Sequence, residues 1–323
     1  MLSQNIFQRK STPMDDGSIL RRGSHLVDLD SISMEGISGI LNLAHEIEAG
    51  KVDLSGSMKG KLLIPLFFQE SSRTFTNSTS SFIRMGGSVL AVNVENTRLN
   101  KRWREPIRDF CQLINSCCDY AIVRAADAGT VLEFSKWCER PLINAGNGSG
   151  SHSEHPVQAL IDAYVLRKRF GSRPLKILIL GGRHVRSTRS QVKLFKRLGH
   201  SVDLIAYGGD EDNSDIEPFY KANCKEFDDV RSVDISQHDV LLHNGADEDP
   251  RVLSGDKVSL NSELLLRKDF KGIVLHSLPR LAELSRDLDD TPFNFYFDQM
   301  RSSKFIFQSV FANLLDRERT QKG

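Results

Sequence analysis

Apolar residues along the chain form short continuous runs that alternate with stretches in which they recur every third or fourth position. Residues 61–68 (KLLIPLFF) and 176–180 (KILIL) are continuous runs, as in parallel strands that are buried on both faces. Residues 74–85 instead space their apolar side chains along one side of a helix, which Gly86 ends. This alternation predicts an α/β fold built on parallel sheets.

The same patterns predict the remaining elements. Further strands are expected at residues 88–94, 120–123, 141–144, 202–206, 240–243 and 273–276. Further helices are expected at residues 26–49, 106–117, 129–138, 156–169 and 301–319. With 323 residues the chain is longer than one hydrophobic core usually serves, and its pattern restarts after the helix at 156–169.

We therefore expect two doubly wound parallel-sheet domains joined by helices. The first domain is predicted to span residues 25–155 and the second residues 156–302. Residues 303–323, in the last helix, are expected to pack back on the first domain. Residues 1–24 are polar and are expected to form a flexible N-terminal extension.

The charge balance and the cysteines exclude several classes of protein. Forty-three Lys and Arg against 42 Asp and Glu give a net charge of +1, so no broad field attracts nucleic acid or an anionic membrane. No apolar run approaches the roughly 20 residues of a membrane span, and the N-terminus lacks a signal-peptide core, so a cytoplasmic protein is expected. The 5 cysteines show no paired spacing, which argues against a disulfide framework or a zinc site.

Hydroxyl groups and one arginine gather where the first predicted strand ends, in FFQESSRT at residues 67–74. The strand should end near Phe68 and the next helix begin near Ser72, so the unpaired N–H groups of the first turn and the helix dipole prepare an anion site. Ser71, Ser72 and Thr74 add hydroxyl donors, and Arg73 adds a planar fork suited to a phosphate. An ordinary N-cap with an exposed arginine explains the same residues.

A second polar stretch, PLINAGNGSGSHSEHPVQ at residues 141–158, reads as a strand, a glycine-rich loop and a helix start. Pro156 fits the first helical position, where its missing N–H costs nothing. His155 and Gln158 are three apart and face the same way from the first turn. His152 and His155 also have the spacing of a metal pair, but without a third ligand beside them.

Three motifs, FFQESSRT, NAGNGS followed by HPVQALIDAY, and LHSLPR, resemble the aspartate and ornithine carbamoyltransferases in their order and separations. Those families have S-T-R-T after a strand, H-P-x-Q at a helix start, and an H-P-L-P-R or H-C-L-P loop. The resemblance runs from about residue 26 to the C-terminus. LHSLPR and DLDDTPFNFYFDQM are most similar to the aspartate branch, and the S-M-G motif of the ornithine branch is absent.

The resemblance implies that Ser71, Ser72, Arg73 and Thr74 hold the phosphate of carbamoyl phosphate. The first domain is then a carbamoyl-phosphate-binding domain, and the second binds an amine or amino-acid acceptor. The reaction of this family needs neither a metal nor an organic cofactor.

The resemblance also assigns the rest of the carbamoyl site. Thr74, Arg124 and His155 would surround the carbonyl oxygen and stabilise the oxyanion as the amine attacks. Gln158 and the backbone carbonyl of Leu278 would orient the carbamoyl NH₂ group. Arg124 ends a predicted strand, from which it can reach the carboxyl edge of the sheet.

In this family a neighbouring subunit lends a lysine from a loop, so the resemblance implies a homotrimer with shared active sites. The corresponding stretch here is TRLNKRWREP, which makes Lys101 or Arg102 the candidate. A solvated charged loop is the competing interpretation.

The acceptor side departs from the aspartate branch at two places. In LGGRHVRSTRS, Ser187 stands where an arginine is expected, with Arg186 one place earlier. In LLHNGADEDPR, Gly245 and Asp247 replace the arginine and glutamine of an R-x-Q motif. These changes would leave one carboxylate of aspartate unpaired, at a cost on the order of several kcal/mol. They point to a different acceptor, contacted by His243 or the acidic loop, unless that loop is only a variable surface segment.

LHSLPR differs from the aspartate branch at Ser277, where a proline is usual, and Arg280 remains able to pair with a carboxylate. The leading hypothesis is thus a carbamoyltransferase whose acceptor is an amino-acid-like amine other than aspartate. The alternatives are a genuine aspartate carbamoyltransferase of pyrimidine synthesis and a non-catalytic carbamoyl-phosphate-binding or scaffolding homologue. A nicotinamide-binding dehydrogenase is disfavoured because LGGRHVRS lacks the G-x-G-x-x-G pattern.

Overall fold

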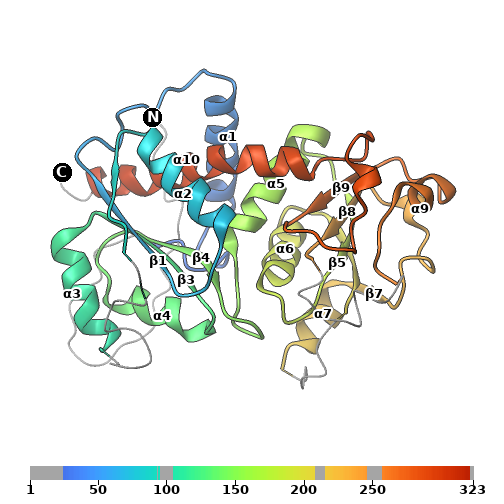
Figure 1. The fold of residues 1–323 in the computed structure, drawn as a ribbon, viewed down its shortest axis with the longest axis horizontal. Helices are drawn as coiled ribbons and strands as arrows, with labels where there is room; N and C mark the ends of the chain where they lie inside the picture. Colours follow the sequence, from blue (N-terminus) through green and yellow to red (C-terminus); the bar gives the residue numbers. More distant parts are fainter. Residues whose placement is uncertain (1–24, 93, 95–104, 208–214, 246–256, 321–323) are drawn as a thin grey trace. The chain divides into compact units, whose positions relative to one another are not determined.

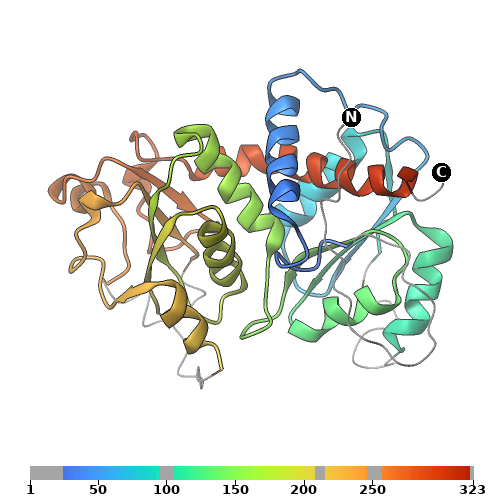
Figure 2. The same cartoon turned by 180° about the vertical axis from the view of Figure 1, so that it is seen from behind.

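The computed structural model describes residues 25–92, 94, 105–207, 215–245 and 257–320, and of residues 315–320 the backbone only. The chain forms two compact units. Unit 1 comprises residues 1–148, 154–160 and 303–323, and unit 2 comprises residues 149–153 and 161–302. Figure 1 labels the elements of both units, and Figure 2 shows them from behind. The expected N-terminal extension lies outside the described residues. No helix in the described part of the chain is long and apolar enough to cross a membrane.

Unit 1 contains a parallel sheet with the strand order β2-β1-β3-β4. Its strands are β1 (Leu62–Phe67), β2 (Ser88–Val89), β3 (Tyr120–Ala125) and β4 (Leu142–Asn147). The apolar run of β1 is buried along its centre, as a strand covered on both faces requires. Pro65, which has no N–H to donate, lies beyond the two residues of β1 that pair with β2.

Helices cover both faces of this sheet (Figures 1 and 2). They are α1 (Met34–Glu48), α2 (Ser72–Arg84), α3 (Ile107–Cys117) and α4 (Ala128–Trp137). On one face Phe110 of α3 and Phe134 of α4 pack on the sheet in one core cluster. On the other face Phe311, from the C-terminal part of the chain, packs edge-on against Phe82 and Tyr120, with ring centroids 4.9 and 5.9 Å away.

Unit 2 contains a second parallel sheet, with the strand order β7-β6-β5-β8-β9. Its strands are β5 (Lys176–Leu180), β6 (Ser201–Ile205), β7 (Lys225–Phe227), β8 (Val240–His243) and β9 (Ile273–His276). Its helices are α6 (Arg186–Arg197), α7 (Glu217–Asn223), α9 (Ser262–Arg267) and the 3₁₀ turns η2 (Ile235–Gln237) and η3 (Arg286–Leu288). Leu178 and Leu180 of β5 belong to the same core cluster as Leu264 and Leu265 of α9. The predicted class, α/β with two doubly wound parallel sheets, is confirmed.

Two helices are shared between the units. Helix α5 (Pro156–Phe170) starts in unit 1 and ends in unit 2, and α10 (Tyr296–Thr320) starts in unit 2 and ends in unit 1. The boundary expected between residues 155 and 156 lies inside the segment 154–160 of unit 1.

Four element predictions need correction. The helix expected at residues 26–49 begins only at Met34, because Leu26 instead pairs with the edge of β4, donating to Leu142 O and accepting from Asn144 N. The strand expected at 88–94 is confined to two residues. Strand β7 was missed because its three residues, two of them charged, lie at the sheet edge. The last helix begins five residues earlier than expected, at Tyr296.

Candidate active site

Each sheet has a point where successive connections run in opposite directions, and polar residues follow the strands there. In unit 1 the chain goes from β1 outward to β2 but from β3 outward to β4, so the switch lies between β1 and β3. In unit 2 the switch lies between β5 and β8. Ligands of open α/β sheets bind at the carboxyl ends of the strands at such points. Ser71 to Thr74 follow β1 and Ser187 follows β5, both at these points, whereas His155 and Ser277 follow the neighbouring strands β4 and β9.

The N-terminus of α2 follows β1 directly and presents donors without a side-chain cap. Ser71 is the N-cap residue, with extended backbone (φ −164°, ψ 98°), and its side chain makes no capping hydrogen bond. The N–H groups of the first turn are therefore open to a ligand. Ser72, Arg73 and Thr74, the first three residues of α2, are all at least partly exposed.

Arg73 is the unusual side chain of this turn. Within the described part of the chain, its guanidinium has neither a hydrogen-bond partner nor an ion-pair partner. Burial lowers the pKa of Arg73, although a guanidinium stays charged at any physiological pH. A partly buried cation with no counter-charge among the described residues favours the binding of an anion.

Arg124 and His155 reach the same edge of the unit 1 sheet from two neighbouring strands. Arg124 pairs in register with Phe67 at the end of β1, and its carbonyl accepts from Phe68 N at 2.8 Å. Its Nη1 donates to Ala145 O at 3.1 Å, which directs the side chain towards β4. His155 is buried and precedes α5, and Gln158 lies one turn further on.

A buried polar network, which was not predicted from the sequence, fixes the backbone before His155. Asn144 donates to Val27 O at 2.7 Å and to Asn147 Oδ1 at 2.9 Å. Asn147 Oδ1 in turn accepts from Glu154 N at 2.8 Å, and Glu154 Oε2 accepts from Leu29 N at 3.0 Å. The available signal was the pair of asparagines inside the apolar strand β4, since buried polar groups need partners.

Gly148, at the start of the loop between β4 and His155, has no room for a side chain. Its φ is +58°, and a Cβ atom would lie 2.4 Å from Ala128 N. The loop that leads to His155 therefore requires glycine at this place.

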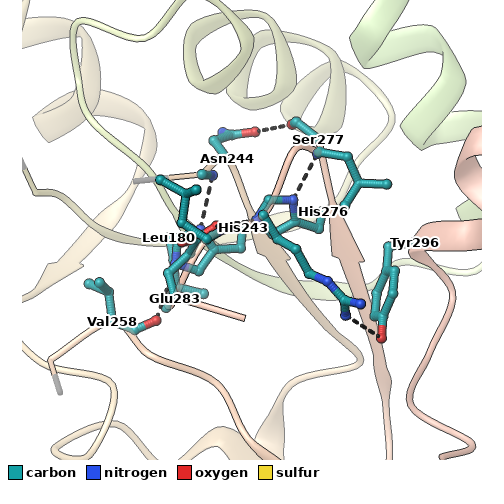
Figure 3. A network of polar contacts seen from close by, with 12 residues as sticks. Leu180, His243, Asn244, Val258, His276, Ser277, Glu283 and Tyr296 are labelled. Carbon is teal, nitrogen blue, oxygen red and sulfur yellow. Dashed lines mark hydrogen bonds and ion pairs between the residues drawn. The ribbon is translucent and has the colours of Figure 1, made fainter. Parts of the chain in front are cut away.

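In unit 2, two stacked histidines end the neighbouring strands β8 and β9 (Figure 3). The rings of His243 and His276 lie 5.4 Å apart at an interplanar angle of 18°. Each ring accepts at Nδ1 from a backbone N–H two residues further on, His243 from Gly245 at 3.0 Å and His276 from Leu278 at 2.7 Å. In both strands, the histidine ring thus holds the first turn after the strand by accepting this backbone hydrogen bond.

The other ring nitrogens identify the tautomers. Nε2 of His243 faces Val258 O at 3.2 Å, and Nε2 of His276 faces Glu283 Oε1 at 3.0 Å. Because both neighbours are acceptors, Nε2 carries the proton in each ring. Burial and the neighbouring His276 lower the pKa of His243. Burial alone would raise the pKa of Glu283, but hydrogen bonds from His276 and backbone N–H groups outweigh it and lower that pKa.

Lowering the pH from 7 to 5 is expected to destabilise the protein, with His243 responsible for part of the loss. Because the folded-state pKa of His243 lies below the ordinary 6.5, the unfolded chain takes up a proton first. The stabilisation is complete above pH 6.5 and is lost as the pH falls below it, by at most about 1.4 kcal/mol per pH unit. Urea denaturation at several pH values measures the slope.

His238 and His200 also have lowered pKa values, so a variant is needed to isolate His243. His243→Gln, whose amide oxygen can still accept from Gly245 N, should reduce the loss of stability between pH 7 and 5. His45→Gln, at an exposed position of α1, serves as the control and should leave the slope unchanged. A slope in His243→Gln equal to that of the unmodified protein would contradict the assignment.

The remaining predicted acceptor residues have different surroundings. Ser187 is buried near the start of α6, while Arg186 beside it is partly exposed. Gly245 has a φ of +83°, which favours glycine at this turn. Arg280 donates with both terminal nitrogens to the carboxylate of Asp289, and its Nη1 also lies 3.3 Å from the hydroxyl of Tyr296. Its guanidinium is therefore already paired inside unit 2.

Three predicted site residues, Lys101, Arg102 and Asp247, lie outside the described residues. The described residues also contain no group of three or more His, Cys, Asp or Glu side chains arranged to hold a metal ion. Ser71 to Thr74, Arg124 and His155 belong to unit 1, whereas the histidine pair and Leu278 belong to unit 2. Each group lies at the carboxyl ends of the strands of its own sheet.

Known proteins resemble this chain in sequence and in structure. The family model for the aspartate/ornithine carbamoyltransferase carbamoyl-P binding domain matches residues 24–168. The aspartate carbamoyltransferase catalytic subunit of Finegoldia magna is 28% identical over 311 residues, covering 91% of this chain and 98% of the relative. The multifunctional protein pyr1-3 of Dictyostelium discoideum is also 28% identical, over 90% of this chain but only 13% of its own length.

Solved structures show the same similarity across both units. Aspartate transcarbamoylase from Trypanosoma cruzi in complex with carbamoyl phosphate and aspartate has a TM-score of 0.77 and 27% sequence identity to this chain. The match covers 91% of this chain and 96% of that structure. The complex of the same enzyme with N-(phosphonacetyl)-L-aspartic acid matches equally well, with a TM-score of 0.77.

Proposed function

Because the chain belongs to the aspartate/ornithine carbamoyltransferase family, we propose that it transfers the carbamoyl group of carbamoyl phosphate to the amine of an amino acid and releases phosphate. The observation that carries the proposal is the uncapped N-terminus of α2 with Arg73 beside it. This anion site lies at the switch point of unit 1, within the stretch that matches the carbamoyl-P binding domain.

The residues of unit 1 have the chemistry to hold carbamoyl phosphate. The phosphate would accept hydrogen bonds from the first-turn N–H groups of α2 and from the Ser71, Ser72 and Thr74 hydroxyls, with Arg73 as a bidentate cation. Unit 1 would thus be the carbamoyl-phosphate domain and unit 2 the acceptor domain.

Thr74, Arg124 and His155 would donate to the carbonyl oxygen, where negative charge develops as a neutral amine attacks. Gln158 and the Leu278 carbonyl would orient the carbamoyl NH₂ group. The amine adds to the carbonyl carbon to form the N–C bond. The tetrahedral intermediate then collapses with loss of the C–O bond to phosphate, and the departing phosphate takes the proton of the amine. No protein side chain is needed as a general base.

Aspartate is the acceptor that the comparisons favour. The Finegoldia magna relative is named for aspartate, and the Trypanosoma cruzi structure was solved with it. These similarities support aspartate better than they support the other acceptor predicted from the sequence. One observation favours a second candidate, an amino acid without a second carboxylate: Ser187 and Gly245 stand at two positions where the aspartate branch has arginine.

Ligand binding and product formation test the proposal in turn. Carbamoyl phosphate or a phosphonate mimic, at millimolar concentration, should raise the melting temperature, since a ligand that binds only the folded state stabilises it. Aspartate and a panel of other amino acids and amines are then incubated with carbamoyl phosphate, and the carbamoylated product is identified by mass spectrometry together with the phosphate released.

The outcomes separate the candidates. Product with aspartate identifies an aspartate carbamoyltransferase, and product with another amine alone identifies the second candidate. Ligand binding without product from any amine would favour the non-catalytic scaffold. A melting temperature that responds neither to carbamoyl phosphate nor to the phosphonate mimic would contradict the proposal.

The resemblance also implies a homotrimer. Light scattering should then give three times the chain mass of 36.3 kDa.

A further inference from the structure

The side chain of Asn244, directly after β8, connects α6 to the segment that follows β9. Its Nδ2 donates to Thr188 Oγ1 at 2.9 Å and to Gln191 Oε1 at 2.7 Å. Its Oδ1 accepts from Ser277 Oγ at 2.7 Å and from Gln191 Nε2 at 3.1 Å. The amide thus uses both of its donors and both lone pairs, which fixes its orientation. Figure 3 shows Asn244 and Ser277 pointing toward each other.

A chain of hydrogen bonds runs from Asn244 through buried side chains to the end of β9, next to its partner Ser277. Gln191 Nε2 donates to Asp162 Oδ2 at 2.7 Å, and Gln299 Nε2 donates to the other oxygen of that carboxylate. Gln299 Oε1 accepts from His276 N at 3.0 Å, and His276 precedes Ser277 in the chain. Asp162, Gln191 and Gln299 are all at least 97% buried. This closed ring of buried polar groups lies wholly within unit 2 and gives Ser277 a fixed partner.

The backbone next to Ser277 has a conformation that needs such support. Leu278 has a φ of +46°, in the left-handed region that residues with a Cβ atom rarely adopt. Its N–H donates to His276 Nδ1 at 2.7 Å, and Ser277 N donates to His243 O at 3.1 Å. The Ser277 hydroxyl bond to Asn244 is the third restraint, and together the three set the direction of the Leu278 carbonyl.

We infer that Asn244 and Ser277 are positioning residues for carbamoyl transfer, acting by fixing the direction of the Leu278 carbonyl, the group that the proposed function assigns to the carbamoyl amino group. The inference rests on the proposed function. The aspartate branch has a proline at position 277, and the ring of a proline restricts the backbone by itself. Serine lacks that restriction. The hydrogen bond to Asn244 supplies the missing rigidity from the neighbouring strand end.

Ser277→Ala is the variant that tests this role. Its affinity for carbamoyl phosphate, measured by calorimetry, should fall about tenfold, which corresponds to ~1.4 kcal/mol. Its affinity for inorganic phosphate should not change, because phosphate has no amino group for the Leu278 carbonyl to accept from. With the acceptor identified in the amine panel, kcat should also fall. Ser277→Thr keeps the hydroxyl and should restore both carbamoyl phosphate binding and kcat.

Two further variants control for general effects. Ser309→Ala removes another buried serine hydrogen bond, to Ile40 O in unit 1, and should leave carbamoyl phosphate binding unchanged. Asn244→Ala should weaken carbamoyl phosphate binding, and the double variant with Ser277→Ala should lose no more than the larger single change, as expected for two residues that act through one bond.

Unchanged carbamoyl phosphate affinity in Ser277→Ala would overturn the inference. An equal loss for carbamoyl phosphate and phosphate would overturn it as well, since that pattern marks a merely structural effect. If the unmodified protein bound neither ligand, the proposed function would fail, and the inference with it. If the unmodified protein binds carbamoyl phosphate and Ser277→Ala binds it with the same affinity, the inference is rejected but the proposed function is not.

Discussion

Replacing Arg73 by alanine is expected to abolish the thermal stabilisation by carbamoyl phosphate and to lower kcat/KM by about 10²–10³-fold, as the loss of one charge-stabilising donor does. The guanidinium has no partner among the described residues, so the phosphate would supply its counter-charge. For the same reason the unliganded variant should be as stable as the unmodified protein or more so, because a partly buried cation is removed. Thermal unfolding with and without ligand, and phosphate release, measure the two effects.

Two companion variants make this result specific. Arg84→Ala removes an exposed arginine from the last turn of the same helix and should change neither measurement. Arg73→Lys keeps the charge but loses the planar fork, and should recover only part of the binding. Full ligand stabilisation in Arg73→Ala would place the phosphate elsewhere and remove the central support for the proposed function.

Glu283→Ala is expected to destabilise the protein by about 2–5 kcal/mol at pH 7, because each buried donor left without an acceptor costs about 1–3 kcal/mol. Glu283 is fully buried and accepts from His276 Nε2 at 3.0 Å and from Leu281 N at 2.9 Å. Truncation would leave these two donors without an acceptor inside unit 2. Urea denaturation at pH 7 measures the loss, and Glu263→Ala, at an exposed position of α9, is the control.

The effect of Glu283 also has a defined pH window. Its net pKa is lowered from the ordinary 4.5, so its stabilising effect is fully present above that value and is lost as the pH falls further. The difference in stability between the unmodified protein and Glu283→Gln should therefore shrink below pH 4.5. A constant difference down to pH 3 would show that the carboxylate charge is not what stabilises this pair.

The sequence predicted most of the fold because most of its signals are local. The buried runs of β1 and β5 and the glycines after the helices are recognisable within ten residues, and the structure has strands and helix ends there. The helix expected at residues 26–49 was wrong in its first part because pairing of Leu26 with β4, more than a hundred residues away, overrides the local pattern. Strand β7 is too short and too polar to leave a periodic signal.

In the candidate site, too, the sequence predicts residues that lie close together along the chain but not contacts between distant segments. Ser71 to Thr74 form one continuous segment, so a strand-to-helix junction sufficed to predict an anion site there. Asn244 and Ser277 are 33 positions apart, and only the pairing of β8 with β9 makes them neighbours. Arg280 was predicted to meet a carboxylate of the acceptor, but Asp289 lies within its reach in the fold, which no spacing rule indicates.

The C-terminal part of α10 has a consequence for synthesis of the protein on the ribosome. Phe311 completes the aromatic cluster with Phe82 and Tyr120 in unit 1, but residues 161–302 are translated before it. At the usual translation rate of 5–20 residues per second, roughly 7–28 s pass before the helix that covers this face of unit 1 is synthesised. During that time a nascent chain exposes aromatic side chains to chaperones and proteases. Ribosome-bound chains arrested at residue 300 should therefore be cleaved in unit 1 far faster than the released protein.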